Sequence, residues 1–337
     1  MSAPIAKRAK QRHSFWRHIG RFFAVLGTTL AFALVLVLGA VFLFCKGPSP
    51  SARNLFTTTM METSALKFIP RIFLSAEEVE SILNDNAVYE PEINTDVNIP
   101  FEDRNESIPK DAIELIDIAG ATYAGKLMIV HDPSRVSVAT LPSFNEERDG
   151  LTVELFAKRN NAVAAINGGG FLDENGFGSG GMPTGIVIKN GKLVFGTSDT
   201  LSSVIAFDDN NHLIVGQMTG AQCLEKNVRD AVSFGPALIV NGEPLEVSGS
   251  GGGVNPRTVV GQRADGAVLL LVIDGRQAHS LGATYKDCID VMLAHGAVNA
   301  GNLDGGSSTA MYYNGEIVNS CVALKGARWI PTAFIVK

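Results

Sequence analysis

The first 61 residues of this 337-residue chain contain no aspartate or glutamate. They hold eight lysines and arginines, so the rest of the chain carries 20 basic and 34 acidic side chains, a net charge of −14. This acidity excludes the basic face that electrostatic binding of nucleic acid requires. Only 18% of residues are charged and 46% are hydrophobic, which excludes a disordered chain, and the 35 glycines follow no triplet period.

Cysteine is scarce. Cys45 closes a hydrophobic run, and Cys223, Cys288 and Cys321 follow it; because three is an odd number, at least one of these thiols is unpaired or intermolecular. We expect all three to be small buried hydrophobic residues. No Cys-x-x-Cys pair and no cluster of cysteine with histidine occurs, so the sequence predicts neither a zinc site of the usual spacing nor a cofactor.

One long uncharged run of 24 residues extends from Phe22 to Cys45. A helix of about 20 residues spans the hydrocarbon core of a bilayer, whereas the apolar part of a cleaved signal peptide has about 7–15 residues and ends in small ones. Six basic residues precede the run and two follow it shortly, so the positive-inside rule places the N-terminus in the cytoplasm. We therefore predict a signal anchor with the remaining chain outside the cytoplasm.

These features divide the chain into four parts. The segment after the run is rich in Pro, Ser and Thr up to about Met61, as in a linker, and Ser75 with Glu78 predicts the capping box of a short helix. The expected parts are a cytoplasmic tail (1–21), a transmembrane anchor (22–45), a juxtamembrane linker with a short helix (46–109) and an outer domain (110–337).

Strand and hairpin signals dominate the outer domain. Residues 267–273 are apolar at every position and predict a buried strand, and residues 284–295 predict an amphipathic helix that Gly296 ends. Three Asn-Gly pairs between apolar runs predict hairpin turns: Asn190-Gly191, Asn241-Gly242 and Asn314-Gly315. The expected fold class is α/β or α+β, with a mixed β-sheet core and flanking helices.

The first polar motif, Asn167-Gly-Gly-Gly-Phe171, directly follows an apolar strand. Consecutive glycines let the main chain approach a ligand closely, and an asparagine at the end of a strand can bind a sugar hydroxyl or a phosphate oxygen. A tight turn that Asn167 caps explains the same residues equally well.

A second motif flanks the buried strand, with Asn255-Pro-Arg257-Thr258 before it and Asp274-Gly-Arg276 after it. Charged residues directly beyond an apolar strand are typical of sites in sheet proteins, and arginine presents a fork of donors that fits phosphate. His279 follows closely enough to line the same site. An Asp–Arg ion pair at the edge of a sheet is the alternative.

The third motif is Asn302-Leu-Asp304-Gly-Gly-Ser307-Ser308-Thr309. It combines a carboxylate, three hydroxyls and glycine amides that can form an anion-binding nest. On local grounds, an Asp-Gly turn that closes a hairpin is at least as compatible with these residues.

Taken together and in this order, the motifs resemble those of the phosphodiester glycosidase family over about residues 110–337. The resemblance implies a hydrolase that cleaves a sugar-1-phosphodiester at the anomeric C–O bond. Bacterial members of this family are similar in layout, being anchored cell-envelope proteins often associated with exopolysaccharide, so a phosphodiester-linked glycan of the envelope is the implied substrate.

The implied reaction needs stabilisation of the departing phosphate and of an oxocarbenium-like sugar, and activation of water. The resemblance places Arg257 and Arg276 on the phosphate, and Asp304 and Asp274 as the carboxylates, one of them acting as nucleophile or base. The expected substrate-binding residues are Asn167, Gly168, Gly169, Asn302, Gly305, Gly306, Ser307, Ser308 and His279.

Two other functions fit the same residues. A non-catalytic scaffold protein of exopolysaccharide assembly would use them to hold a glycan without cleaving it. A metal-dependent phosphodiesterase would use Asp274 and Asp304 as metal ligands and cut the P–O bond. Turnover of a synthetic sugar-phosphodiester excludes the scaffold, and sensitivity to chelators distinguishes the two hydrolases.

Overall fold

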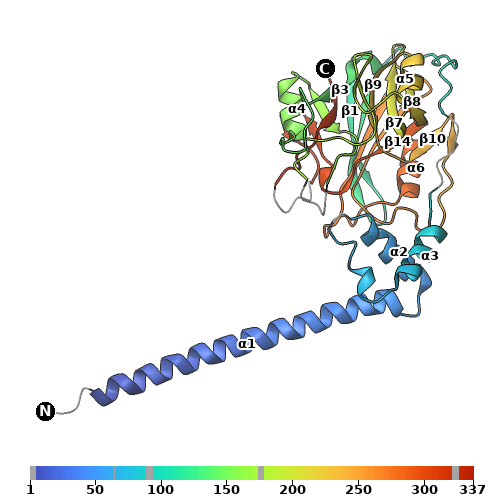
Figure 1. Cartoon of the computed structure of the whole chain (residues 1–337). Helices are drawn as coiled ribbons and strands as arrows, with labels where there is room; N and C mark the ends of the chain where they lie inside the picture. The colour runs from blue at the N-terminus through green and yellow to red at the C-terminus, as the bar shows by residue number, and fades with distance from the viewer. Residues whose placement is uncertain (1–4, 64, 89–93, 174–177, 321–325) are drawn as a thin grey trace.

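The computed structural model describes residues 5–63, 65–88, 94–173, 178–320 and 326–337. One long helix, α1 (Ile5–Lys46), leads into a helical subdomain of three short helices, which lies against a body built from β-sheets (Figure 1). The helices of this subdomain are α2 (Pro50–Met61), the 3-10 helix η1 (Pro70–Ile72) and α3 (Ala76–Asp85).

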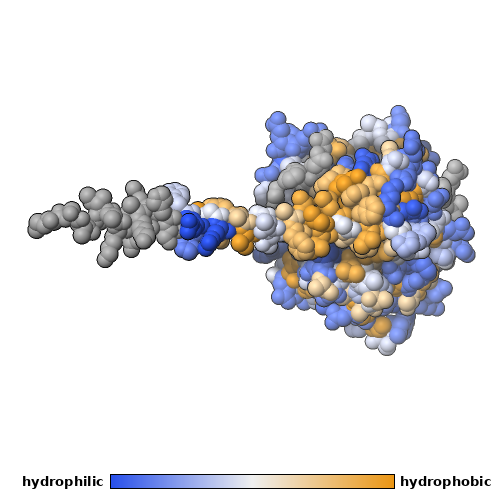
Figure 2. All heavy atoms as spheres, turned by 90° about the horizontal axis from the view of Figure 1, so that it is seen from below, coloured by the Kyte–Doolittle hydropathy of each residue, from blue (hydrophilic) through white to orange (hydrophobic). Residues whose placement is uncertain are grey.

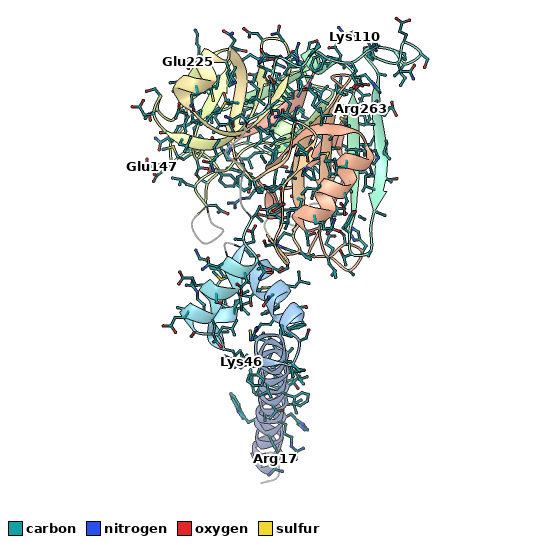
Figure 3. The ribbon with its side chains drawn as sticks, turned by 90° about the vertical axis from the view of Figure 1, so that its right-hand side faces the viewer. Arg17, Lys46, Lys110, Glu147, Glu225 and Arg263 are labelled. Carbon is teal, nitrogen blue, oxygen red and sulfur yellow. The ribbon has the colours of Figure 1, made fainter. Side chains whose placement is uncertain are left out.

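Helix α1 contains the predicted membrane span. Its part from Phe15 to Lys46 is long and apolar enough to cross a membrane. Figure 3 shows Arg17 near the free end of this helix and Lys46 at its junction with the helical subdomain. The hydrophobic side chains between them are exposed to the surroundings, as a helix in contact with lipid requires.

The expectation that the chain is a linker up to Met61 is corrected by helix α2. The helix begins where the hydroxyl of Ser49 accepts a hydrogen bond from the amide of Ala52 and Pro50 occupies the first turn, both of which favour helix initiation. In α3, the predicted capping box is confirmed, because Ser75 and Glu78 each bind the other's main-chain amide.

Three sheets form the body, and the strand pairs of the described residues are antiparallel. The first sheet has seven strands in the order β1 (Ile113–Ala119), β2 (Ala124–Val130), β13 (Val268–Ile273), β12 (Arg257–Arg263), β14 (Ala297–Leu303), β10 (Ala237–Val240) and β11 (Glu243–Pro244). The second has the order β16 (Glu316–Ile317), β15 (Met311–Tyr313), β4 (Ala164–Asn167), β17 (Thr332–Val336) and β3 (Val136–Thr140). The third has the order β6 (Lys192–Phe195), β5 (Val187–Lys189), β9 (Val228–Ser233), β7 (Leu201–Asp208) and β8 (Leu213–Thr219).

The three sheets enclose one common core, and a helix covers the outer face of each. In β2, Met128 and Val130 point into the common core, while Leu127 and Ile129 pack beneath α6 (Tyr285–Ala294). The outer faces of the second and third sheets are covered in the same way by α4 (Val153–Arg159) and α5 (Gly220–Glu225). A sheet buried on both faces explains why β13 is apolar at every position. The predicted sheet core with flanking helices is confirmed, in its α+β form.

The turns and helix ends that the sequence predicts are confirmed by the structure. The three predicted Asn-Gly hairpins are confirmed, with Asn190, Asn241 and Asn314 at φ of 50°, 54° and 47°. These left-handed conformations suit asparagine followed by glycine in a tight hairpin turn. Helix α6 begins at its cap Thr284 and is followed by Gly296 at φ 82°, as predicted. Of the cysteines, Cys223 and Cys288 are buried and free, and Cys321 lies outside the described residues.

Strand register gathers the polar motifs at one edge of the first sheet. Strand β12 begins at Arg257, opposite Ile273 at the end of β13, and Thr258 lies opposite Leu303 at the end of β14. Because antiparallel neighbours run in opposite directions, the start of β12 and the ends of β13 and β14 meet at the same edge. The second and third predicted motifs therefore lie side by side.

Candidate active site

Three loops meet around Pro256 at this edge. The carbonyl of Pro256 accepts a hydrogen bond from the amide of Gly306 at 3.0 Å. A β-carbon on Gly275 would lie 2.8 Å from the nitrogen of Pro256, so only glycine allows the loop after β13 to approach so closely. The loops after β13 and β14 thus both contact the segment that precedes β12.

Asn167 joins the second sheet to these loops. Its side chain is fully buried, and its Nδ2 donates to the carbonyl oxygen of Asp304 at 2.5 Å. Its Oδ1 accepts from the hydroxyl of Thr258 at 2.8 Å and from the amide of Ala310 at 3.3 Å. Because both ends of the amide bind protein, Asn167 positions the main chain at Asp304.

The surroundings of Asp304 shift the pKa of its carboxyl strongly. Desolvation raises the pKa of its carboxyl from 3.8 to about 6, and the charge of Asp173 acts in the same direction. Hydrogen bonds from the hydroxyl of Ser308 and from the amide of Gly305 oppose this shift, as does the positive charge of Arg328. A carboxyl group with these properties changes its charge near neutral pH, as groups in acid–base chemistry do.

The glycines of the first motif pack closely against protein. A β-carbon on Gly168 would lie 2.7 Å from the carbonyl oxygen of Thr332, and one on Gly169 would lie 2.7 Å from that of Ser233. Both glycines are buried. The close approach that they permit in the described structure is therefore to neighbouring strands, and their contact with a substrate stays a prediction.

Arg257 is buried, with most of its donors already bound. Its Nε donates to the carbonyl of Ala283 at 3.2 Å, and its Nη2 donates to the carbonyls of Gly252 and Gly253. Its guanidinium carbon lies 4.0 Å from the centre of the Tyr285 ring. The remaining nitrogen, Nη1, lies 3.6 Å from a carboxylate oxygen of Glu62. The fork expected to hold phosphate is thus used largely for structure, and Nη1 is the nitrogen that faces Glu62.

Arg276 is more open than Arg257. It adopts the left-handed conformation, with φ of 57°, and its Nη2 donates to Asn255 Oδ1 at 2.9 Å and to Thr63 Oγ1 at 3.2 Å. Its Nη1 lies 3.5 Å from where a β-carbon on Gly306 would stand, so the guanidinium covers the glycine loop after Asp304. Burial, followed by the positive charge of Arg257, lowers the pKa of Arg276 from its usual value. Within the described residues, no carboxylate lies within ion-pair distance of it.

Asp274 lies at the same edge but has other partners. Its Oδ1 accepts from Asn319 Nδ2 at 2.9 Å and from the amide of Ser320 at 3.0 Å, and its Oδ2 lies 3.5 Å from His279 Nε2. Within the described residues, its side-chain contacts do not include Asp304. The predicted pairing of these two carboxylates therefore stays a prediction.

The remaining predicted residues lie around the same loops. The Nδ2 of Asn302 donates to the carbonyl of Gly235 at 2.8 Å, and its buried Oδ1 has no hydrogen-bond partner among the described residues. Ser307 is half-buried in the 3-10 helix η4 (Gly306–Ser308), and Gly305 is held against the carbonyl of Pro256. No cluster of three or more potential metal ligands occurs in the described ranges.

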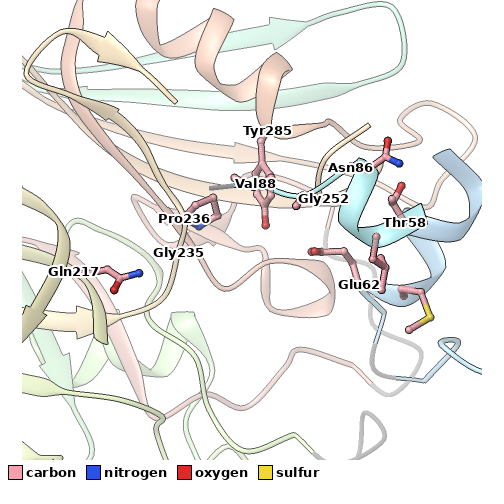
Figure 4. A pocket seen from close by; sticks show the side chains of 12 residues that line it. Thr58, Glu62, Asn86, Val88, Gln217, Gly235, Pro236, Gly252 and Tyr285 are labelled. Atoms are coloured by element: carbon pink, nitrogen blue, oxygen red, sulfur yellow. The ribbon is translucent and has the colours of Figure 1, made fainter. Parts of the chain in front are cut away.

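A cavity of about 560 Å³ lies between the helical subdomain and the body, and its lining includes Glu62, Gly252 and Tyr285, which surround Arg257. Figure 4 shows Thr58 and Glu62 of the subdomain on one side and Tyr285, Gly252 and Pro236 on the other. Glu62 extends from the end of α2 towards the body. The cavity thus has one wall contributed by the chain segment that follows the predicted membrane anchor.

Sequence reasoning missed three charged residues of the site. Glu62 approaches Arg257, while Asp173 and Arg328 form an ion pair whose charges both act on Asp304. Arg328 also lies with its guanidinium carbon 5.0 Å from the ring centre of Phe171. Asp173 follows the first motif closely, which was the available signal. Glu62 and Arg328 come from segments that carry no motif.

Fold and site define a sheet-based domain in which a carboxyl group of raised pKa precedes a glycine loop that an arginine covers. The family model described as phosphodiester glycosidase matches residues 160–337, more than half of the chain. The chain belongs to the phosphodiester glycosidase family.

The chain is similar to a bacterial protein and to the catalytic domain of a fish enzyme. The prophage-derived uncharacterized protein YomE of Bacillus subtilis is 30% identical over 186 residues, which cover 50% of this chain and 27% of YomE. The catalytic domain of zebrafish N-acetylglucosamine-1-phosphodiester alpha-N-acetylglucosaminidase, auto-inhibited by its pro-peptide, has a similar fold with a TM-score of 0.57 and 24% identity. That match covers 70% of this chain and 86% of the zebrafish domain.

Proposed function

We propose that this protein is a hydrolase that cleaves a sugar-1-phosphodiester at the glycosidic C–O bond. The observation that carries the proposal is the placement of Asp304. Its pKa of about 6 and the guanidinium of Arg276 over Gly306 combine an acid–base group with a donor for an anion. Membership of the family supports this assignment.

In the proposed reaction, the bond between the anomeric carbon and the bridging oxygen breaks, and the phosphomonoester leaves with that oxygen. An oxygen atom of water forms the new bond to the anomeric carbon, and the proton that the water loses passes to the ionised carboxylate or to solvent. Because a phosphate leaving group is a weak base, protonating it contributes little, and the ionised form of Asp304 is the productive one.

Arg276 would stabilise the phosphate as its charge grows. Arginine donors suit a phosphate better than a neutral sugar, because each hydrogen bond gains strength as the acceptor becomes charged. Arg257 would contribute through Nη1 and would otherwise hold the loop of Gly252 and Gly253 in place.

The proposed location is the cell envelope. Helix α1 would cross the cytoplasmic membrane with the basic N-terminus inside, and residues 46–337 would face outward towards a phosphodiester-linked glycan, such as an exopolysaccharide. The charge distribution supports this topology, because basic residues precede the apolar run and acidic ones dominate the body. An acidic body has little attraction for anionic glycans except where Arg276 offers a positive charge.

We also propose that residues 62 and 63 mask the site. Glu62 lies 3.6 Å from Arg257 Nη1, and the hydroxyl of Thr63 accepts from Arg276 Nη2 at 3.2 Å. Both groups therefore lie where the anionic oxygens of a phosphodiester would bind. The similar fold of the zebrafish catalytic domain, which is auto-inhibited by its pro-peptide, supports this proposal. Displacement of this segment would expose both arginines.

The decisive experiment supplies the purified full-length protein with synthetic sugar-1-phosphodiesters in water enriched in oxygen-18. Label in the released sugar, with unlabelled phosphomonoester, supports C–O cleavage; label in the phosphate, with activity lost to chelator, supports a metal-dependent phosphodiesterase. Binding without turnover of any of these compounds would favour a glycan-binding scaffold.

A further inference from the structure

An apolar surface lies beside the end of α1, on the helical subdomain. Residues 66–72 expose Leu66, Phe68 and Ile72, with 38%, 59% and 48% of their surface accessible. Lys67 and Arg71 alternate with them and are also exposed. Figure 2 shows apolar side chains gathered on this side of the molecule, where α1 leaves the body. Contiguous apolar surface of this kind marks an interaction site on a folded protein.

Ring contacts fix this surface to the end of the apolar helix. Phe73, next to the surface, packs edge-on against Phe42 of α1 with ring centres 5.5 Å apart. Phe56 of α2 stacks on Phe44 of α1 at 5.0 Å. Both partners in α1 belong to the uncharged run that ends at Cys45. The subdomain therefore touches the part of α1 where the hydrocarbon core would end.

Packing and chain length hold the apolar surface of residues 66–72 close to the end of α1 where the hydrocarbon core would end. Cys45 is fully buried in a cluster with Leu74, Val79 and Ile82, so the last turn of α1 belongs to the fold of the subdomain. Three residues separate the end of α1 from the start of α2, which extended chain could stretch to only about 10 Å. The subdomain cannot move far from the level at which α1 leaves the membrane.

We propose that residues 66–72 form an interfacial contact surface that rests in the headgroup region of the bilayer that α1 crosses. Aromatic and aliphatic side chains flanked by lysine and arginine are the composition that this region favours. The same subdomain carries Glu62 and Thr63, so lipid contact holds the masking segment and the candidate site at a fixed height above the membrane. This inference rests on the proposed anchoring by α1.

Three variants of the full-length protein, each with one added exposed cysteine, test it in nanodiscs. A Cys321→Ser background leaves three cysteines, all buried and therefore poorly reactive. Phe68→Cys places an environment-sensitive fluorophore on the surface, and Phe32→Cys places one within the anchor. Leu201→Cys is the matched control, because Leu201 in the body is 59% exposed, as is Phe68. Lipids with a nitroxide in the headgroup or along the acyl chain supply the quencher.

We expect quenching at 68 by headgroup nitroxide to exceed that at 201 at least threefold, and acyl-chain nitroxide to quench the probe at 32. Quenching at 32 with equal, weak quenching at 68 and 201 overturns the contact surface and leaves the anchor in place. Absence of quenching at 32 overturns both the contact surface and the anchoring by α1. Weak quenching at 68 together with two copies per nanodisc would show that a second copy, rather than lipid, covers the surface, and would also overturn the inference.

Discussion

The side-chain amide of Asn167 donates a hydrogen bond to the main-chain oxygen of Asp304 and thereby connects the second sheet to the loop after β14. The residues are 137 positions apart in the chain, and neither motif alone indicates the contact. Asn167 is buried and binds protein through both ends of its amide. This hydrogen bond fixes the backbone of Asp304 and thereby positions its carboxyl group.

Replacing Asp304 by asparagine tests the central carboxylate. We expect turnover of a sugar-1-phosphodiester to fall at least about 100-fold, because the variant cannot act as base or nucleophile. The melting temperature at neutral pH should stay the same or rise slightly, since burial disfavours the ionised carboxylate in the folded state. A large loss of stability with activity retained would instead identify Asp304 as a turn residue.

The pH dependence follows from the raised pKa of Asp304. If the ionised carboxylate is productive, kcat/KM should rise with pH through an apparent pKa near 6, and Asp304→Asn should lack this limb. Stability should change in the opposite direction. The folded protein holds the proton more tightly than the unfolded chain, so the contribution to stability is full below pH 4 and is lost as pH rises to about 6. Activity that falls through pH 6 would contradict the assigned role.

The two arginines should respond differently to substitution. Arg276→Gln removes an exposed charge over the glycine loop and should lower kcat/KM roughly 10- to 100-fold with little change in stability. Arg257→Lys keeps the charge but loses the bonds to the carbonyls of Ala283, Gly252 and Gly253, so it should destabilise the fold by about 2–4 kcal/mol. Steady-state kinetics beside denaturant unfolding separate the effects; equal behaviour of both variants would contradict the division of roles.

Masking by Glu62 predicts a gain of activity. Glu62→Gln removes the charge beside Arg257 Nη1 and should raise kcat/KM by about 2- to 5-fold, the range expected for one partly exposed ion pair. Glu77→Gln is the control, because Glu77 is an exposed acid in the first turn of α3. An unchanged or lower kcat/KM in Glu62→Gln, measured beside this control, would contradict the masking proposal.

The glycines of the first motif supply a test of packing. In Gly168→Ala the new methyl group would meet the carbonyl of Thr332 at 2.7 Å and its hydroxyl at 2.4 Å, and we expect a loss of about 1–3 kcal/mol in unfolding free energy. In Gly39→Ala, nothing lies within 4 Å of the new carbon, so this control should unfold like the parent. A stable Gly168→Ala variant with weaker substrate binding would favour direct ligand contact at that position.

Local patterns predicted the elements well because their causes are local. Left-handed φ angles at Asn190, Asn241 and Asn314 are properties of a turn and its own residues, and the capping box at Ser75 closes within one helical turn. Helix α2 was missed because its Pro- and Ser-rich start is equally typical of a linker; packing of the subdomain against α1 and the body stabilises the helix there.

The sequence by itself determined the basic start, the apolar span, the hairpins, the all-apolar strand and the motifs at the strand ends. Tertiary structure alone decided which polar groups meet. Strand order brings Arg257, Asp274 and Asp304 to one edge, while Asp274 binds Asn319 and Arg257 binds main-chain carbonyls. It also places Glu62, 195 positions before Arg257, against that arginine. Hydrogen bonds and burial between distant segments depend on how the sheets pack, and no local pattern encodes that packing.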